Sequence, residues 1–135
     1  KREPADVIRK RARQLLQQMG IEKIQERDIR EASGGELQRA SICRAMINHP
    51  DILFLDEPTG ALNSSATEQV LDILEDLNRD GMTIVTITHN PQVAARAKRV
   101  LYILDGQIAA IKEFSEGSDR DKEMGEWLHG MQPVA

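Results

Sequence analysis

The chain has 135 residues, of which 18 are Lys or Arg and 22 are Asp or Glu, so its formal charge is −4. Apolar residues make up 40 % of it and charged residues 30 %, which suits a soluble domain with one core and excludes a membrane-embedded protein. The single cysteine, Cys43, excludes an internal disulfide framework, and the acidic balance argues against a broad phosphate-backbone contact, so no nucleic-acid partner is expected.

An amphipathic helix is predicted from Ala5 to Met19, and Gly20 ends it. Its apolar positions recur at steps of three and four residues: Val7, Ile8, Ala12, Leu15, Leu16 and Met19. Its other face carries the basic residues Arg9, Lys10, Arg11 and Arg13. A nucleic-acid-binding stripe is one interpretation of these charges, but we favour a solvent-exposed helix face because no aromatic residue accompanies them.

A short polar turn precedes a second predicted helix, which runs through Cys43 to Ile47. The turn consists of Ser33, Gly34, Gly35 and Glu36. A serine followed by a glutamate three residues later is the spacing of an ordinary capping box. The same turn offers a hydroxyl, two glycine N–H groups and the positive end of a helix dipole, which suits a phosphate. Both interpretations stay open, and Cys43 is interpreted as a small buried side chain.

A buried strand followed by two acids comes next. The four apolar residues from Ile52 to Leu55 predict a strand covered on both faces, and Asp56 and Glu57 follow it directly. The acids either face water at the strand end or divide a task. In the second case one holds a hydrated Mg²⁺ ion, and the other takes a proton from an attacking water or orients it.

The following segment predicts a βαβ unit. A capping box at residues 65–68 opens a helix, Gly81 ends it, and the β-branched run from Thr83 to Thr88 is a strand. The carboxyl ends of parallel strands lie at one edge of a sheet, so we expect His89 to approach Asp56 and Glu57 there. A histidine in this position is otherwise an ordinary cap or surface residue.

The C-terminal part predicts a β-hairpin and little else. Val100–Leu104 and Gln107–Ile111 are apolar runs joined by Asp105 and Gly106, the preferred residues of a two-residue turn. Beyond Phe114 the sequence is polar, and residues 119–128 are predicted to form at most a short helix.

Four motifs, in this order and spacing, resemble the second half of an ABC-type ATPase domain. The motifs are Ala32 to Arg39, Ile52 to Thr59, Gly60 to Asn63, and Thr88 with His89. The resemblance covers about Ala5 to Phe114. The run Asp-Glu-Pro-Thr-Gly-Ala-Leu is similar to that of subunits that drive export of lipoproteins, macrolides or antimicrobial peptides.

The resemblance implies a role for each matching residue, with ATP and Mg²⁺ as cofactors. Glu57 would be the general base, His89 the histidine that touches the γ-phosphate, and Asp56 the acid that binds Mg²⁺ through water. The implied nucleotide-binding residues are Ser33, Gly34, Gly35, Glu36 and Asn63. In the family, the segment matched by Ser33 to Gly35 contacts the γ-phosphate of an ATP held mainly by the opposite subunit.

The resemblance also implies a fold and partners. The fold would be α/β: part of a P-loop NTPase (RecA-like) parallel sheet with helices on both faces, part of an ABC helical subdomain, and a C-terminal β-hairpin. Residues 1–48 would belong to the helical subdomain, 49–114 to the ATPase core, and 115–135 to a polar tail. A transmembrane permease and a second ATPase domain in a homodimer would be the partners, which places the protein in the cytoplasm on the inner face of the cell membrane.

The sequence departs from the family pattern at Ala32, Glu36 and Asn63, where Leu, Gln and Asp are usual. Nothing in it reads Gly-x-x-x-x-Gly-Lys-Ser/Thr, the phosphate-binding loop, and its first residue is not Met. We therefore expect the C-terminal portion of an ATP-hydrolysing motor subunit, inactive as a 135-residue piece. Two alternatives stay open: an ABC-type ATPase that acts on DNA or ribosomes, and a non-catalytic interaction module.

Overall fold

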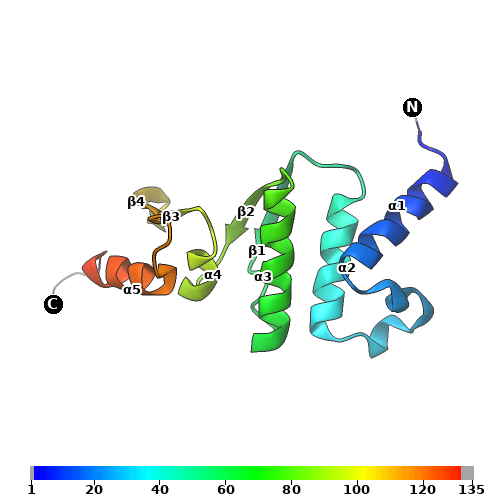
Figure 1. The fold of residues 1–135 in the computed structure, drawn as a ribbon, viewed down its shortest axis with the longest axis horizontal. Helices are drawn as coiled ribbons and strands as arrows, with labels where there is room; N and C mark the ends of the chain where they lie inside the picture. Colours follow the sequence, from blue (N-terminus) through cyan, green and yellow to red (C-terminus); the bar gives the residue numbers. More distant parts are fainter. Residues whose placement is uncertain (1, 132–135) are drawn as a thin grey trace. The chain divides into compact units, whose positions relative to one another are not determined.

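The structure is a computed structural model that describes residues 2–131 and divides the chain into two compact units, Lys1–Ile87 and Thr88–Ala135. The first unit contains α1 (Ala5–Gln18), the 3-10 helices η1 (Glu22–Glu26) and η2 (Ile29–Glu31), α2 (Gly34–Met46), β1 (Ile52–Asp56), α3 (Ser64–Arg79) and β2 (Thr83–Ile87) (Figure 1). The second contains α4 (Pro91–Ala95), β3 (Arg99–Leu104), β4 (Gln107–Glu113) and α5 (Arg120–Met131). No helix within residues 2–131 is long and apolar enough to cross a bilayer.

The helices α1 and α2 pack through apolar side chains and two arginines. Met19 and Ile42 are almost fully buried. Arg11 donates from Nη1 to the carbonyl of Ile47 at 2.8 Å, and Arg39 donates to the carbonyl of Met19 at 3.1 Å. Each arginine thus binds a carbonyl that the end of a helix leaves without an internal partner. The predicted first helix is confirmed. The prediction that its basic side chains are exposed to solvent is wrong for Arg11, whose side chain is only 17 % exposed.

The predicted βαβ unit is confirmed. The strands β1 and β2 are parallel, and their register runs from Ile52 opposite Thr83 to Asp56 opposite Ile87. Figure 1 shows α3 alongside the two strands, and this helix buries Val70, Leu71, Leu74 and Leu77. Because the strands are parallel, their carboxyl ends lie at the same edge of the sheet.

The start of α3 differs from the prediction. Asn63 Oδ1 accepts a hydrogen bond from the backbone N–H of Ala66 at 2.8 Å, and the helix begins at Ser64. The expected capping box at residues 65–68 is therefore wrong. Asn63 has an extended backbone (φ −71°, ψ 170°), so its short side chain reaches the third N–H of the helix and starts it earlier.

One face of the two-stranded sheet is apolar and exposed. It consists of Ile52, Phe54, Val85 and Ile87, called here the open face, and Phe54 is 70 % exposed. On the other face Leu53 and Leu55 are buried. The prediction that the first strand is covered on both faces is thus wrong for the described chain, because alternate side chains point to opposite sides and only one side is buried.

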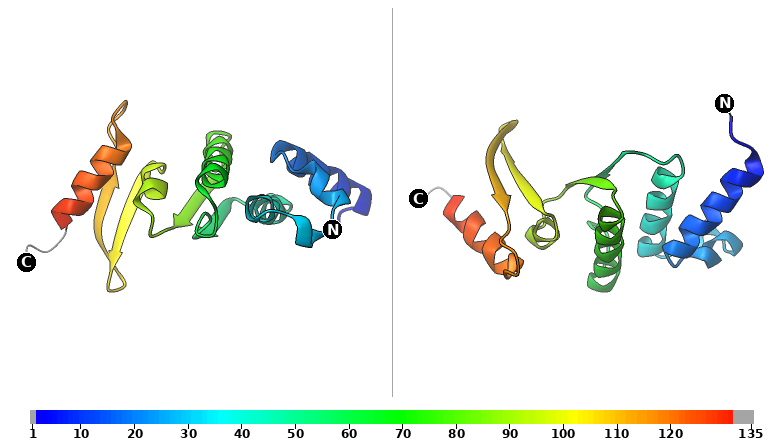
Figure 2. Two further views of the ribbon diagram at one scale, coloured as in Figure 1. Left: turned by 90° about the horizontal axis from the view of Figure 1, so that it is seen from below. Right: turned by 45° about the horizontal axis from the view of Figure 1, so that its top comes forward.

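The second unit is a hairpin with a helix beside it, as Figure 2 shows. Asp105 (φ 50°) and Gly106 (φ 74°) form the predicted two-residue turn between β3 and β4. Tyr102 and Trp127 meet edge to face, with their ring centroids 6.3 Å apart. This contact joins α5 to the hairpin. The helix covers 12 of the described residues, Arg120 to Met131, whereas the sequence predicted at most a short helix within residues 119–128.

An ion pair adds to this packing. Lys112 Nζ lies 2.9 Å from Glu123 Oε2. Lys112, and to a smaller extent Ser118, lower the pKa of Glu123 to about 2 from an ordinary value of 4.5. A lowered pKa stabilises the folded state at pH values above 4.5, and this stabilisation is lost as the pH falls toward 2.

Candidate functional site

The Ser33–Glu36 turn forms both hydrogen bonds of a capping box. Ser33 Oγ accepts from the backbone N–H of Glu36 at 3.1 Å, and Glu36 Oε1 accepts from the backbone N–H of Ser33 at 3.4 Å. The capping interpretation of the turn is thereby confirmed. Capping uses only an acceptor site of the Ser33 hydroxyl, which still carries a hydrogen that it can donate. The turn can therefore start α2 and still offer a donor to an anion.

The two glycines of the turn lie close to the segment that leads into α3. A Cβ atom on Gly35 would stand 3.0 Å from the Cβ of Ala66, whereas one on Gly34 would stand 3.5 Å from Cδ2 of Leu62. The first distance is shorter than most carbon–carbon contacts, so Ala66 would have to shift by a few tenths of an ångström, whereas the second is an ordinary contact. The structure therefore favours glycine at position 35, and the contact places the Ser33–Glu36 turn beside the helix that Asn63 caps.

We expect Gly35→Ala to destabilise the first unit by about 1–3 kcal/mol, because the added methyl group overpacks the contact with Ala66. Gly34→Ala is the matched control and should change the unfolding free energy by less, since its methyl group meets only Leu62 at contact distance. Chemical denaturation followed by circular dichroism measures both. Equal stability of the two variants would contradict the packing role, whereas recovery in Gly35→Ala/Ala66→Gly would support it.

The acidic pair lies at the carboxyl end of β1. Asp56 is the last residue of the strand and is exposed. Glu57 follows with φ 46°, the left-handed region, which is uncommon for a residue other than glycine. Its backbone N–H donates to the carbonyl of Ile87 at 2.8 Å, and its carbonyl accepts from Gly60 at 3.2 Å. These two bonds hold Glu57 in a strained conformation, a feature that clusters at functional sites.

His89 follows β2 by two residues and belongs to the second unit. The next residue, Asn90, accepts a hydrogen bond from the backbone N–H of Gln92 at 2.9 Å and caps α4, a short helix that sequence analysis missed. The register of β1 and β2 brings the ends of the two strands together, as expected. The approach of His89 to Asp56 and Glu57 stays a prediction.

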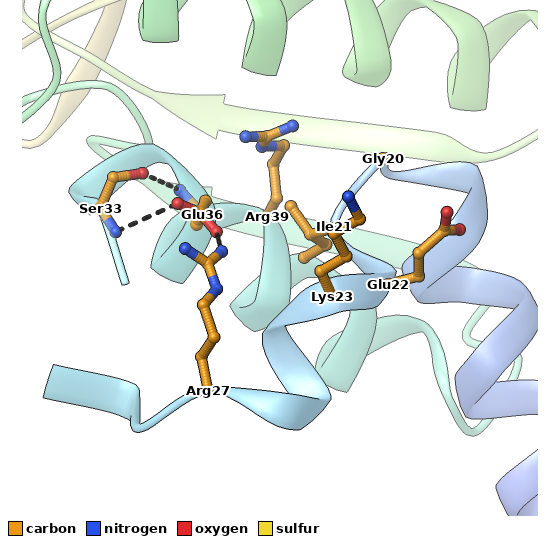
Figure 3. A pocket seen from close by; sticks show the side chains of 8 residues that line it. All are labelled: Gly20, Ile21, Glu22, Lys23, Arg27, Ser33, Glu36 and Arg39. Carbon is orange, nitrogen blue, oxygen red and sulfur yellow. Dashed lines mark hydrogen bonds and ion pairs between the residues drawn. The ribbon is translucent and has the colours of Figure 1, made fainter. Parts of the chain in front are cut away.

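A pocket of about 340 Å³ lies beside the Ser33–Glu36 turn (Figure 3). Besides Ser33 and Glu36, its lining consists of Gly20, Ile21, Glu22, Lys23, Arg27 and Arg39. Arg27 donates to Glu36 Oε2 and forms an ion pair with it. Sequence analysis missed Arg27, since it precedes Glu36 by nine residues across irregular chain, where no periodic pattern reveals a partner.

Cys43 behaves as the sequence suggested. It is buried on α2, and burial raises the pKa of its thiol to about 11. Since only a thiolate is a good nucleophile, Cys43 is a packing residue at neutral pH.

The acidic pair could contribute ligands to a hydrated magnesium ion, but it does not form a metal site made of protein ligands alone. Within residues 2–131, no group of three or more His, Cys, Asp or Glu side chains could hold a metal ion. Mg²⁺ usually keeps several waters and is bound by one or two carboxylates together with substrate phosphates. The exposed carboxylate of Asp56 at the strand end fits that limited demand.

Comparisons with known proteins identify a family for the chain. The family model for ABC transporters matches residues 3–60. The chain is 50 % identical over 107 residues to the macrolide export ATP-binding/permease protein MacB 1/2 of Paracoccus denitrificans (strain Pd 1222). The aligned region covers 79 % of the chain and 16 % of that protein. It is also 50 % identical over 100 residues to MacB of Haemophilus ducreyi, covering 74 % of the chain and 14 % of the relative.

Solved structures show the same fold. The dimeric ATP-binding cassette MJ0796 bound to ADP and Pi is 34 % identical, with a TM-score of 0.71, over 84 % of this chain and 50 % of that one. The cassette MJ1267 is 20 % identical, with a TM-score of 0.81, over 97 % of this chain and 49 % of that one. The chain thus spans about half the length of these cassettes. Its α/β fold is that of the P-loop NTPases, and the chain belongs to the ATP-binding domains of ABC transporters.

Proposed function

We propose that the chain is the C-terminal part of the ATP-binding and ATP-hydrolysing domain of an ABC transporter of the exporter type. The observation that carries the proposal is the acidic pair at the end of β1, where Glu57 is held in a left-handed conformation against β2. The identity to macrolide exporters supports the direction of transport. The proposed division is helical subdomain (1–48), ATPase core (49–114) and tail (115–135).

Each residue of the site has a separate task in this proposal. Bound Mg²⁺ would supply positive charge to the phosphates of ATP, held through water by Asp56. Glu57 would accept a proton from the attacking water, and His89 would donate a hydrogen bond to the γ-phosphate. Because Glu57 is held in place by backbone bonds to Ile87 and Gly60, little reorganisation would be needed to orient its carboxylate.

The Ser33–Glu36 turn would serve a second ATP, bound mainly by another copy. Its donors are the Ser33 hydroxyl, the N–H groups of Gly34 and Gly35, and the positive end of the α2 dipole. Two further residues, Glu36 in the turn and Asn63 at the start of α3, would also contact the nucleotide. The dimeric cassette MJ0796 supports a paired arrangement. A permease would be the further partner, at the inner face of the cell membrane.

An assay of Mg-ATP hydrolysis by the full-length protein tests the proposal. Asp56→Asn should lower kcat/KM about 10- to 100-fold, because a water-mediated metal contact loses its charge. Asp51→Asn is the matched control, since Asp51 is exposed and precedes β1 at the opposite end of the strand. Equal activity of the two variants, or a full-length protein without Mg-ATP hydrolysis, would overturn the proposal.

The proposal includes the inactivity of the isolated 135-residue chain, which holds the hydrolytic acids but no Gly-x-x-x-x-Gly-Lys-Ser/Thr sequence. An ABC-type ATPase that acts on DNA or ribosomes would copurify with nucleic acid in place of a permease. A non-catalytic module would show no hydrolysis even as the full-length protein. The relatives named above favour the transporter over both.

A further inference from the structure

A carboxylate stands inside the turn that is proposed to receive a phosphate. Glu36 caps the backbone of Ser33, and its side chain is 18 % exposed. An uncompensated negative charge beside the donors of the turn would repel a phosphate and offset the attraction that the positive end of the α2 dipole exerts on it. The proposed function therefore requires that the charge of Glu36 be neutralised.

Arg27 supplies the opposite charge. Its Nη2 donates to Glu36 Oε2, while Glu36 Oε1 accepts from Ser33. Figure 3 shows the guanidinium of Arg27 reaching toward Glu36 and the dashed lines that join Glu36 to Ser33. The two oxygens of the carboxylate are thus divided between a charge partner and a backbone cap. This division holds the carboxylate against the turn.

The other charged groups of the pocket are Glu22, Lys23 and Arg39. Arg39 donates to the backbone carbonyls of Met19 at 3.1 Å and of Gly35 at 3.4 Å, so it joins α1 to α2. Of the three basic residues that line the pocket, Arg27 forms the ion pair with Glu36.

The titration of Glu36 agrees with this arrangement. Burial raises the pKa of its carboxyl group, but the hydrogen bonds with Ser33 and the charge and hydrogen bond of Arg27 outweigh burial and lower the pKa below its ordinary value. Glu36 is therefore ionised at neutral pH, and loss of Arg27 would leave that charge beside the turn.

We propose that Arg27 is a positioning residue of the Ser33–Glu36 turn, which neutralises Glu36 and holds its carboxylate as the cap of Ser33 so that the turn accepts a phosphate. The inference rests on the proposed function of the turn. It explains how a glutamate is accommodated where the family usually has a neutral glutamine.

Steady-state hydrolysis of Mg-ATP by the full-length protein tests the inference. Arg27→Met should lower kcat/KM about tenfold, because it leaves a like charge facing the phosphate. Arg27→Met/Glu36→Gln should restore it to within about twofold, because a neutral amide needs no cation. The activity of Arg27→Met relative to wild type should also rise as the pH falls toward the pKa of Glu36.

Arg30→Met is the matched control. Arg30 lies on η2, pairs with Asp28 at 2.6 Å and is 86 % exposed, so its loss should leave kcat/KM unchanged. Wild-type activity in Arg27→Met, or failure of Glu36→Gln to rescue a variant that melts like wild type, would overturn the inference. If wild type itself does not hydrolyse Mg-ATP, the proposed function fails, and the inference that depends on it fails with it.

Discussion

Glu57→Gln is expected to lower kcat for Mg-ATP hydrolysis by the full-length protein about 10²- to 10⁴-fold, the usual contribution of a general base. The substitution removes the proton acceptor but keeps the size of the side chain. Binding of Mg-ATP should persist, because the proposed phosphate contacts come from other residues. The protein should therefore accumulate as an ATP-bound dimer, which sedimentation and stoichiometry of bound nucleotide measure.

Glu116→Gln is the control for this prediction. Glu116 is an exposed residue between β4 and α5, so its amide should leave both turnover and assembly as in the wild type. If Glu57→Gln hydrolysed Mg-ATP at the wild-type rate, Glu57 would not be the base and the role given to the acidic pair would be wrong. Loss of nucleotide binding would also contradict the assignment, because it would make Glu57 a binding residue.

The isolated 135-residue chain is expected to self-associate at micromolar to millimolar concentration. The open face presents Phe54 and Ile87, which are 70 % and 57 % exposed. Within residues 2–131, β2 pairs only with β1, so its other edge presents N–H and C=O groups that can pair with another strand. Exposed apolar side chains beside a strand edge favour association between copies.

Phe54→Lys/Val85→Lys should shift the chain toward monomer. The two residues lie opposite each other in register, and burial of two lysine charges between copies would cost free energy. Ile29→Lys is the matched control: Ile29 is 69 % exposed but lies on η2, away from the sheet, and its replacement should leave association unchanged. Light scattering over a concentration series measures the mass. A wild-type chain that stays monomeric throughout would contradict the prediction.

Features that depend on adjacent residues could be predicted from the sequence. The capping box needs only a serine and a glutamate three positions apart, and the Asp105-Gly106 turn needs only two residues that tolerate a positive φ. The parallel pairing of β1 and β2 followed from the helix between them. The recurrence of four motifs in order identified the family, which the comparisons confirm.

Features that depend on distant contacts could not be predicted. Arg27 follows η1 and Glu36 lies on α2, with irregular chain and the short helix η2 between them, so no periodicity reveals that their side chains meet. Arg11 was placed on a solvated face because sequence alone does not show the carbonyl of Ile47 that it binds. Asn63 displaced the expected cap of α3 because two capping residues compete, and the backbone conformation decides between them.

The close approach of Gly35 to Ala66 has a mechanical consequence. Because Gly35 has no side chain, the start of α2 packs directly against the methyl group of Ala66 on α3, which leaves no room for even one added methyl group. We therefore expect a ligand bound at the Ser33–Glu36 turn to shift the start of α3 together with that of α2, because neither helix start has free space in which to move alone.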